Sequence, residues 1–444
     1  MPDIELSDPT PKQMRQAIFA LALPTVGTNL LLRGVGIVDT ALVGHISAEA
    51  QAAVGMAQWI VNLMMAIMQG VALGGTILVA NYTGARDDKN RLSAADSALY
   101  LGIGVSLAIT VIGLLTVKQI AFSMGATIDL YKLVAPYMLI MNLFFISKGM
   151  LQVISGIFQG FGDTKTPFRV IIGVNIVHII IAYPLTFGVW GCPRLEILGV
   201  ALATGISESL GAAFLVYIAY RKKLISFGPY ARKLLKDIVS LGGPVFGERI
   251  STTIMQMVYT RMVLVTSLSA YAAHSVGITI ESISFLPGIG FAQAATTLVG
   301  QQLGARKPHR ARNYGDQTLY IGLIIMGSVG VTFFFFPHLL MKAFSSDPEV
   351  IRYGVTFCKI IAFSQIPMGA TMVLSGSLRG AGKTRTVMYS TVIGGWLFRI
   401  PYAFVVSSIF HLSIFYIWMA MLIDWIARSS LLFIKYSSSK WHEK

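Results

Sequence analysis

The sequence TILVANYTGAR at residues 76–86 returns as TTLVGQQLGAR at residues 296–306, and this pair decides the fold. The two stretches are separated by an offset of 220 residues, and they keep their threonine, leucine, valine and final Gly-Ala-Arg in register. The same offset aligns further landmarks without a net gap, namely Leu21, Pro24 and Gly27 with Leu241, Pro244 and Gly247, and Ser155, Gly156 and Gly160 with Ser375, Gly376 and Gly380. Self-similarity at one fixed offset indicates a chain built from copies of one unit. The sequence therefore predicts two similar halves.

Each half consists of long apolar stretches joined by short polar segments. Hydrophobic residues make up 55% of the 444 residues, charged residues only 12%, and the mean hydropathy is +0.68. The apolar runs reach the roughly 20 residues that a helix needs to cross a bilayer. They are continuous, whereas the strands of a membrane barrel alternate between apolar and polar residues. The expected fold is an all-α membrane protein of about twelve transmembrane helices, six in each half.

The net charge of +15 is spread over loops and does not suggest a nucleic-acid surface. Basic residues fall in every second segment between the spans, which places those segments and both termini in the cytoplasm. The basic segments of the two halves coincide under the offset, so both halves enter the membrane in the same orientation. The lobes are then related by a pseudo-two-fold axis along the membrane normal, as a parallel repeat. The basic residues include Lys12, Arg15, Arg86, Lys89, Arg91, Lys165 and Arg169, and in the second half Arg306, Lys307, Arg310, Arg379, Lys383 and Arg385.

The expected division of the chain follows this pattern. We expect a cytoplasmic N-terminal segment (1–16), an N-terminal six-helix lobe (17–220), a cytoplasmic linker (221–237), a C-terminal six-helix lobe (238–436) and a cytoplasmic tail (437–444). The first segment lacks the basic start and short apolar core of a signal peptide. Two cysteines, Cys192 and Cys358, indicate neither a disulfide framework nor a metal cluster.

Three stretches resemble the multidrug and toxic compound extrusion (MATE) family, most closely its DinF-like branch. They are TTLVGQQLGAR (296–306), VDTALVG (38–44) and GIFQGFGDTKT (156–166), and the likeness extends over essentially the whole chain. The resemblance implies secondary active export of organic, often cationic, compounds in exchange for protons or sodium. It implies neither nucleotide hydrolysis nor a cofactor.

Asp39 matches the first-span aspartate of that family and is the leading candidate for the coupling residue. Ionisable groups inside spans are energetically costly and usually face a cavity or a partner. A carboxylate in a partly dry cleft binds a proton readily, and competition between that proton and a cationic substrate produces antiport. Asn175 and His178 in the fifth span and Thr204 in the sixth are expected to complete the site. In the alternative, Asp39 is merely solvated near the helix end at Gly44.

The coupling ion is expected to be a proton, with sodium as the alternative. An unperturbed histidine titrates near neutrality, which would suit His178 to proton handling, although such a histidine often only joins two helices by a hydrogen bond. Family members often carry an aspartate four residues after the position of His178, and in this chain that place is taken by Ala182. Because an alanine side chain offers no oxygen to sodium, a carried-over sodium site is weakened.

Further charged and polar residues inside spans are candidates for the substrate cleft. They are Glu208, Lys148, Gln152, Glu248 and Glu281. Lys148 is positioned to neutralise Glu208. Asp424 and Arg428, one helical turn apart, are expected to form an internal ion pair. Met368 occupies another position where relatives use an acid, so the C-terminal half is less suited to hold the coupling ion.

Pro24 and Pro244 occupy equivalent positions in the first span of each half. A proline inside a helix removes one backbone hydrogen bond and permits a bend, so both are hinge candidates, with a static kink as the alternative. The stretch from Gly376 to Thr384 resembles a phosphate-binding loop, but Ser377 stands where that motif requires its first glycine. We find no enzyme motif and expect no nucleotide.

The sequence thus predicts a monomeric, ion-coupled exporter of amphipathic organic cations in the cytoplasmic (inner) membrane. Its partners are expected to be small molecules and the lipid bilayer, with no nucleic acid and no metal. One alternative is a flippase for a lipid-linked precursor of the same broad superfamily. Another is a membrane receptor or scaffold that transports nothing.

Overall fold

A computed structural model of the chain describes residues 9–438 and 441, and this part is helical without a strand. The first half contains α1 (Pro11–Gly44), α2 (Ala48–Gly84), α3 (Asp88–Ser123), α4 (Ile128–Leu143), α5 (Phe145–Phe161), α6 (Lys165–Phe187) and α7 (Ile197–Arg221). The second contains α8 (Arg232–Leu264), α9 (Leu268–Gly304), α10 (Pro308–Phe335), α11 (Pro337–Lys342), α12 (Pro348–Gly380), α13 (Thr384–Ile393), the π-helical η1 (Gly394–Arg399), α14 (Ile400–Phe404), the π-helical η2 (Val405–Ile409) and α15 (Ile414–Ser437). The expected all-α fold is confirmed.

The helices provide six spans in each half of the described chain. Ten helices, the run 384–409 among them, are long and apolar enough to cross a membrane, and α4 with α5, bent by 46°, makes an eleventh. The twelfth is α8, whose length of 33 residues suffices to span but whose charged residues lower its hydropathy. The expected terminal segments 1–16 and 437–444 lie partly outside the described residues.

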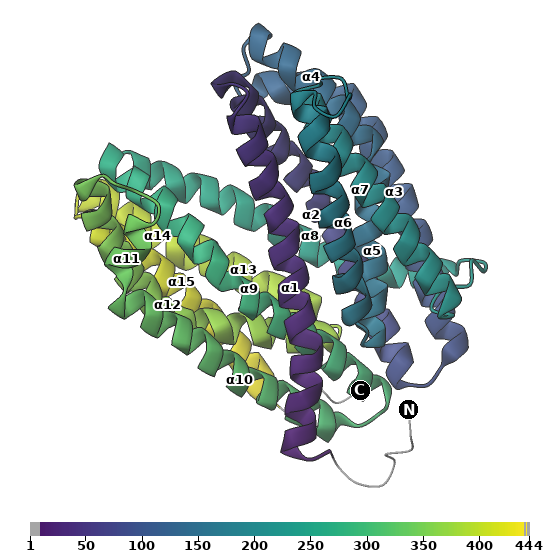
Figure 1. Ribbon diagram of the computed structural model, residues 1–444. Helices are drawn as coiled ribbons and strands as arrows, with labels where there is room; N and C mark the ends of the chain where they lie inside the picture. Colours follow the sequence, from purple (N-terminus) through teal and green to yellow (C-terminus); the bar gives the residue numbers. More distant parts are fainter. Residues whose placement is uncertain (1–8, 439–440, 442–444) are drawn as a thin grey trace. The chain divides into compact units, whose positions relative to one another are not determined.

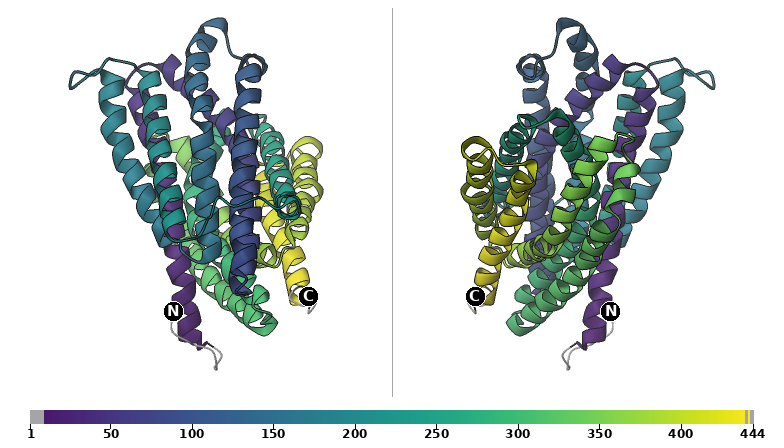
Figure 2. Two further views of the ribbon diagram at one scale, coloured as in Figure 1. Left: turned by 90° about the vertical axis from the view of Figure 1, so that its right-hand side faces the viewer. Right: turned by 90° about the vertical axis from the view of Figure 1, so that its left-hand side faces the viewer.

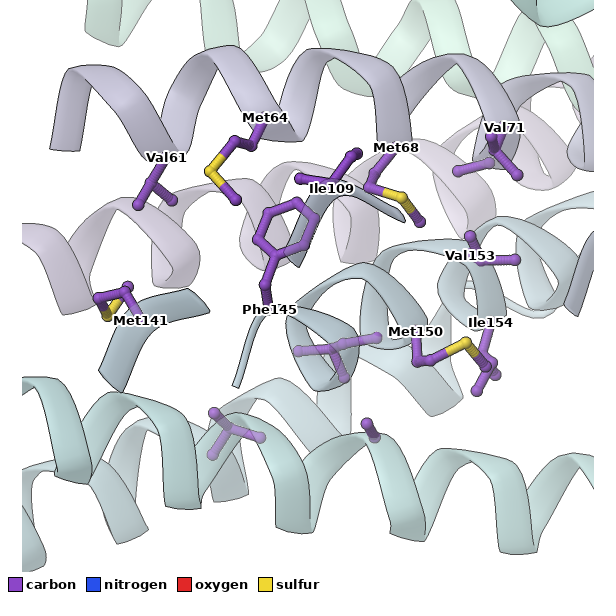
Figure 3. Packing of buried hydrophobic residues seen from close by; sticks show 14 of the residues in the cluster. Val61, Met64, Met68, Val71, Ile109, Met141, Phe145, Met150, Val153 and Ile154 are labelled. Atoms are coloured by element: carbon purple, nitrogen blue, oxygen red, sulfur yellow. The ribbon is translucent and has the colours of Figure 1, made fainter. Parts of the chain in front are cut away.

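Contacts divide the chain into two compact units, one of residues 27–246 and one of residues 1–26 with 247–444. In the first unit, which we call the N-terminal unit, α2, α3, α5 and α7 pack side by side (Figure 1). Its core is filled by methionine, branched aliphatic and aromatic side chains from α2 to α5 (Figure 3). Met64 and Met68 of α2 face Phe145 of α5 and Ile109 of α3 in this core.

The other unit, which we call the C-terminal unit, is organised around α12. This helix packs against α9, α10 and α15. Figure 2 shows the green and yellow helices of this unit from two further sides. The start of α1 joins the same unit, because Met14, Ile18 and Leu21 pack in one cluster with Phe291 and Tyr314. The end of α15 lies near the start of α10, since the Arg312 side chain donates to the Tyr436 carbonyl. Both ends of the described chain therefore lie at one end of this unit, as an even number of spans requires.

The unit boundaries fall inside α1 and α8, shortly after a proline in each. Pro24 precedes the boundary between Val26 and Gly27, and Pro244 precedes the one between Phe246 and Gly247. The first part of α8 packs on α2 so closely that a Cβ atom added at Gly70 would lie 2.7 Å from the Gly242 carbonyl oxygen. The lobe boundaries expected from the repeat, 17–220 and 238–436, describe the duplicated sequence, and they stay a prediction. The two units described here are defined by packing contacts instead.

The repeated sequence encodes the same helix contact in both units. The Thr76 hydroxyl donates to the Gly156 carbonyl at 2.9 Å, and the Thr296 hydroxyl donates to the Gly376 carbonyl at the same distance. A Cβ atom at Gly376 would lie 2.1 Å from the Ala292 carbonyl oxygen, so only glycine fits there. Small residues that let helix backbones approach closely are the usual basis of helix packing in membranes. This contact explains why the quoted stretches are so alike.

Candidate functional site

Asp39, His178 and Thr204 come together from α1, α6 and α7 of the N-terminal unit. The His178 Nε2 atom lies 3.0 Å from Oδ1 of Asp39. The Thr204 hydroxyl lies 3.3 Å from the other carboxylate oxygen and 3.2 Å from the same imidazole nitrogen. The structure therefore brings together three of the four residues expected around the coupling ion.

This trio is buried but not saturated with hydrogen bonds. Asp39 is 9% exposed, and His178 is fully buried. Oδ1 of Asp39 has no aligned hydrogen-bond donor within the described part of the chain, and Nδ1 of His178 also lacks a partner there. The free lone pair of Oδ1 is a position to which a proton can add. The proton can then lie on the carboxyl group or on Nε2, with the Thr204 hydroxyl donating to the group that lacks it.

Close packing of α7 brings Thr204 to this position. A Cβ atom at Gly205 would lie 2.3 Å from the Phe144 ring, and one at Gly211 would lie 2.3 Å from Val174 of α6. These glycines let α7 approach both neighbours closely. Ala182, one turn beyond His178, is also fully buried and adds no polar atom.

A second polar pair extends the site along α7. The Lys148 ammonium group of α5 donates to Oε1 of Glu208 at 2.6 Å, which confirms the expected contact between these two side chains. Glu208 lies one turn beyond Thr204, and Gln152, partly buried, lies one turn beyond Lys148. The opposite charges of Lys148 and Glu208 largely cancel. When His178 is neutral, these residues therefore provide no net positive charge to balance Asp39.

Two residues differ from the expected arrangement. Asn175 donates to the Ile171 carbonyl of its own helix at 2.9 Å and faces Gly34 of α1, about one turn away from Asp39 along that helix. Tyr137 of α4 was not anticipated: it is fully buried and interacts electrostatically with both Asp39 and Glu208. Its signal in the sequence was only a tyrosine inside an apolar run beside Pro136.

Two of the three candidate acids of the C-terminal unit are held by arginines. Glu248 accepts from Arg379 at 2.7 Å and from the Thr391 hydroxyl at 3.2 Å. Asp424 binds Arg428 through both carboxylate oxygens, at 2.5 and 2.7 Å, so the expected ion pair is confirmed. Glu281 is buried at 3% exposure and has an unpartnered Oε1 within the described residues.

The described site can attract a cation but does not look like a metal centre. No group of three or more His, Cys, Asp or Glu side chains in the described ranges is placed to hold a metal ion. The groups beside Asp39 are an imidazole nitrogen and a hydroxyl oxygen, and only the second is a ligand of the kind that hard cations prefer. The arrangement places one carboxylate, one imidazole and one hydroxyl group together inside the membrane-spanning helices.

Comparisons with known proteins identify the family. The MatE family model matches residues 24–184 and 244–405, one match in each half of the chain. The "Probable multidrug resistance protein NorM" of Thermotoga maritima is 29% identical over 436 residues, covering 97% of this chain and 94% of that protein. The "Uncharacterized transporter YisQ" of Bacillus subtilis is 23% identical over 437 residues, covering 96% of this chain and 95% of the other.

Solved structures share the fold. The MATE transporter VcmN of Vibrio cholerae superposes with a TM-score of 0.91 at 17% identity, covering 98% of this chain and 99% of that one. A MATE structure described as being in the bent conformation gives a TM-score of 0.89 at 18% identity, covering 97% of both chains. With its apolar helices and its bacterial relatives, the chain is a multi-pass protein of the inner membrane.

Proposed function

The chain belongs to the MatE family, and we propose that it exports organic cations in exchange for protons, with Asp39 as the residue that both ions compete for. The family assignment carries the general activity, transport of small organic compounds without enzymatic chemistry. The choice of the proton and of Asp39 rests on the site geometry.

The observation that carries the proposal is the incomplete bonding of Asp39. Its Oδ1 atom has no aligned donor, and the imidazole beside it also has a free nitrogen in the described structure. A buried carboxylate is stable only with a proton or a positive charge nearby. When an organic cation approaches the carboxylate, it supplies that charge and displaces the proton; when a proton returns, the cation is released. This cycle gives obligatory exchange.

In this proposal Lys148, Gln152 and Glu208 contact the substrate in the N-terminal unit, and Glu248 is the candidate contact within the C-terminal unit. Asn175 donates to the Ile171 carbonyl of its own helix and has no part in binding the ion in this proposal. Alternating access, in which the site opens to each side in turn, is provided by bending of α1 and α8 after Pro24 and Pro244. The protein is proposed to work as a monomer, because each chain holds its own complete set of these residues.

The test is exchange in proteoliposomes with ethidium as the organic cation. An imposed pH gradient, with sodium absent, is expected to drive ethidium movement, whereas a sodium gradient at equal pH on both sides is not. Asp39→Asn keeps the size of the side chain but removes its titration, and it should lower proton-driven flux about 100-fold.

Asp129→Asn is the matched control. Asp129 lies exposed in the first turn of α4 and, among the described residues, pairs with Lys132 at 2.8 Å. Its flux should equal that of the unchanged chain. Sodium-driven flux that ignores the pH gradient would overturn the choice of coupling ion, and equal flux in the Asp39 and Asp129 variants would overturn the role of Asp39.

A further inference from the structure

The linker between the two halves, residues 221–237, carries a concentration of positive charge that the proposed exchange does not use. It holds six basic residues and a single acid, Asp237. The basic residues are Arg221, Lys222, Lys223, Arg232, Lys233 and Lys236. The linker lies between residues 24–184 and 244–405, the two ranges that the MatE family model matches. Membership of the family therefore does not account for it.

A buried carboxylate fixes the middle of this linker to α3. Asp96 is 1% exposed, and it accepts hydrogen bonds from the backbone N–H groups of Ser226 at 2.9 Å and Gly228 at 3.0 Å. The N–H of Phe227, at 3.2 Å, and the Ser226 hydroxyl, at 2.6 Å, also donate to it. A buried charge is stable only with such bonds. Because Ile225 is also buried in the core of the N-terminal unit, the linker is a folded element and not a free tether.

The second part of the linker is held in the same way. The backbone N–H of Ala231 donates to the Ser97 hydroxyl at 3.3 Å. The ring of Tyr230 packs edge-on against Tyr100 of α3, with the ring centres 6.4 Å apart. Leu234, in the first turn of α8, is buried in the core of the N-terminal unit. The linker therefore presents its outward side chains from a fixed backbone.

The outward side chains of the linker are basic and aromatic. Lys223, Arg232 and Lys233 are exposed. Tyr220, the next-to-last residue of α7, Phe227 and Tyr230 are each about half exposed, and the Tyr220 and Phe227 rings lie with their centres 5.8 Å apart. Aromatic residues gather at the boundary between membrane and water, and Lys and Arg gather on its cytoplasmic side. This combination is typical of a surface that meets lipid headgroups.

The positive charge of this surface is largely unbalanced by the protein. Within the described ranges, Lys222 is the one basic residue of the linker that forms an ion pair, with Asp163 at 2.7 Å. The ammonium and guanidinium groups of Lys223, Arg232 and Lys233 stay available to an external anion. Basic groups beside a membrane attract the anionic lipids of its cytoplasmic leaflet.

The geometry points to this surface, which we call the linker strip, as a docking site for an anionic phospholipid of the cytoplasmic leaflet. The linker strip consists of Tyr220, Lys223, Phe227, Tyr230, Arg232 and Lys233. The basic groups bind the phosphate, and the aromatic rings lie against the apolar part of the same lipid. Free phosphate would meet the cations alone, so the exposed rings favour a lipid. Because Asp96 fixes the backbone beforehand, little order is lost on binding. This binding goes beyond the proposed function and does not depend on export.

Docking is tested with Tyr230→Trp, whose new tryptophan reports contact with brominated lipid by loss of fluorescence. The full-length chain is placed in phosphatidylcholine vesicles that contain brominated phosphatidylglycerol, and brominated phosphatidylcholine provides the reference lipid. The same chain without this substitution gives the contribution of the six native tryptophans. The association constant of phosphatidylglycerol relative to phosphatidylcholine at the new tryptophan is the measured quantity.

Two triple variants, both carrying the tryptophan reporter, separate a site from simple charge attraction. One removes the basic groups of the linker strip, as Lys223→Gln, Arg232→Gln and Lys233→Gln. The matched control removes the same charge from exposed residues of the C-terminal unit on the cytoplasmic side, as Lys307→Gln, Lys383→Gln and Arg385→Gln. The relative association constant should fall at least about fivefold in the first variant, since each basic group near the surface contributes about that factor. It should stay unchanged in the control.

Three results would overturn the docking site. They are an equal fall in both triple variants, a relative association constant near one in the unchanged background, and displacement of phosphatidylglycerol by inorganic phosphate at constant ionic strength. The third result would assign the cations to a free anion. All six positions are exposed, so neither variant is expected to change the thermal unfolding of the chain.

The positioning role of Asp96 has a separate test. Asp96→Asn keeps every basic group of the linker strip but removes the charge that holds its backbone, so it should lower the relative association constant and speed tryptic cleavage after Lys223 and Arg232. Asp88→Asn, an exposed acid in the first turn of α3 that pairs with Arg91, is the control and should change neither. Unchanged cleavage and unchanged association in Asp96→Asn would overturn this role.

Discussion

The two units keep the same helix contacts but carry opposite chemistry at equivalent positions. At the offset of 220 residues, Asp39, Thr204 and Glu208 of the N-terminal unit correspond to Tyr259, Asp424 and Arg428 of the C-terminal unit. In the first unit the carboxylate of Asp39 meets an imidazole and a hydroxyl. In the second, Asp424 is enclosed by two arginines at 1% exposure of its side chain.

The difference shows which features of the repeat both units share and which features differ between them. The threonine–glycine contacts that join the helices recur with identical distances, since the fold of each unit requires them. The polar residues were free to diverge. In the N-terminal unit Asp39 has an incomplete set of hydrogen bonds, which suits exchange. In the C-terminal unit the equivalent region holds the tightly paired Asp424 and Arg428. Substitutions in the two regions should therefore fail in different ways.

The largest expected effect is the loss of stability in Asp424→Asn. This change leaves the buried guanidinium groups of Arg399 and Arg428 without a carboxylate, and removing one partner of a buried pair costs about 3–5 kcal/mol. Thermal unfolding of the purified variant should shift strongly downward, whereas Asp39→Asn should stay close to the unchanged chain. Equal stability of the two variants would remove the distinction drawn between the units.

The next effect concerns the pH dependence of export in His178→Gln. Glutamine keeps a hydrogen-bond donor near Asp39 but does not titrate. The change of ethidium flux with pH should flatten, because the imidazole beside Asp39 is replaced by a group that carries no titrating proton. Flux measured across this range, with Asn175→Gln as a polar control on the same helix, provides the comparison. An unchanged pH profile would reduce His178 to a structural link between helices.

A smaller effect is expected from Pro24→Ala in α1. Restoring the backbone hydrogen bond stiffens the helix where the two units divide it, and export should slow several-fold while proton binding at Asp39 remains. Pro184→Ala tests a proline near the end of α6 as the control. Unchanged transport at normal protein amount would mean that Pro24 only kinks the helix.

The smallest effect is expected at the loop before α6, where the halves also differ, since Asp163 corresponds to Lys383. Burial raises the pKa of Asp163, but hydrogen bonds from Lys222, at 2.7 Å, and from Thr166 outweigh it and lower the pKa overall. The stabilisation is then fully present above the ordinary carboxyl pKa and is lost as the pH falls through the lowered value. Asp163→Asn should destabilise the protein by about 0.5 kcal/mol at neutral pH and by less in acid. Thermal unfolding at several pH values measures this, and a pH-independent loss would contradict it.

The fold could be predicted from the sequence because its determinants are periodic. The repeat, the apolar runs and the glycines at helix contacts are all visible in the sequence, and the structure uses them directly. The pairs Lys148 with Glu208 and Asp424 with Arg428 were also within reach, since opposite charges inside a membrane seek one another.

The rest of the site depends on rotations that the sequence does not specify. Asn175 shares only part of a helix face with His178. Its side-chain amide donates to a carbonyl of its own helix instead of to Asp39. Arg399 contacts the ring of Tyr259 from far along the chain, and the π-helical turns of η1 alter the direction in which it points. Such local insertions leave no periodic signal in the residues.

The central claim is that a proton and an organic cation compete for Asp39. It is tested most directly by adding ethidium to the purified protein in weakly buffered solution and measuring proton release. The account predicts release that saturates together with ethidium binding and disappears in Asp39→Asn but not in Asp129→Asn. Ethidium binding without proton release, or equal release from the Asp39 variant, would contradict it.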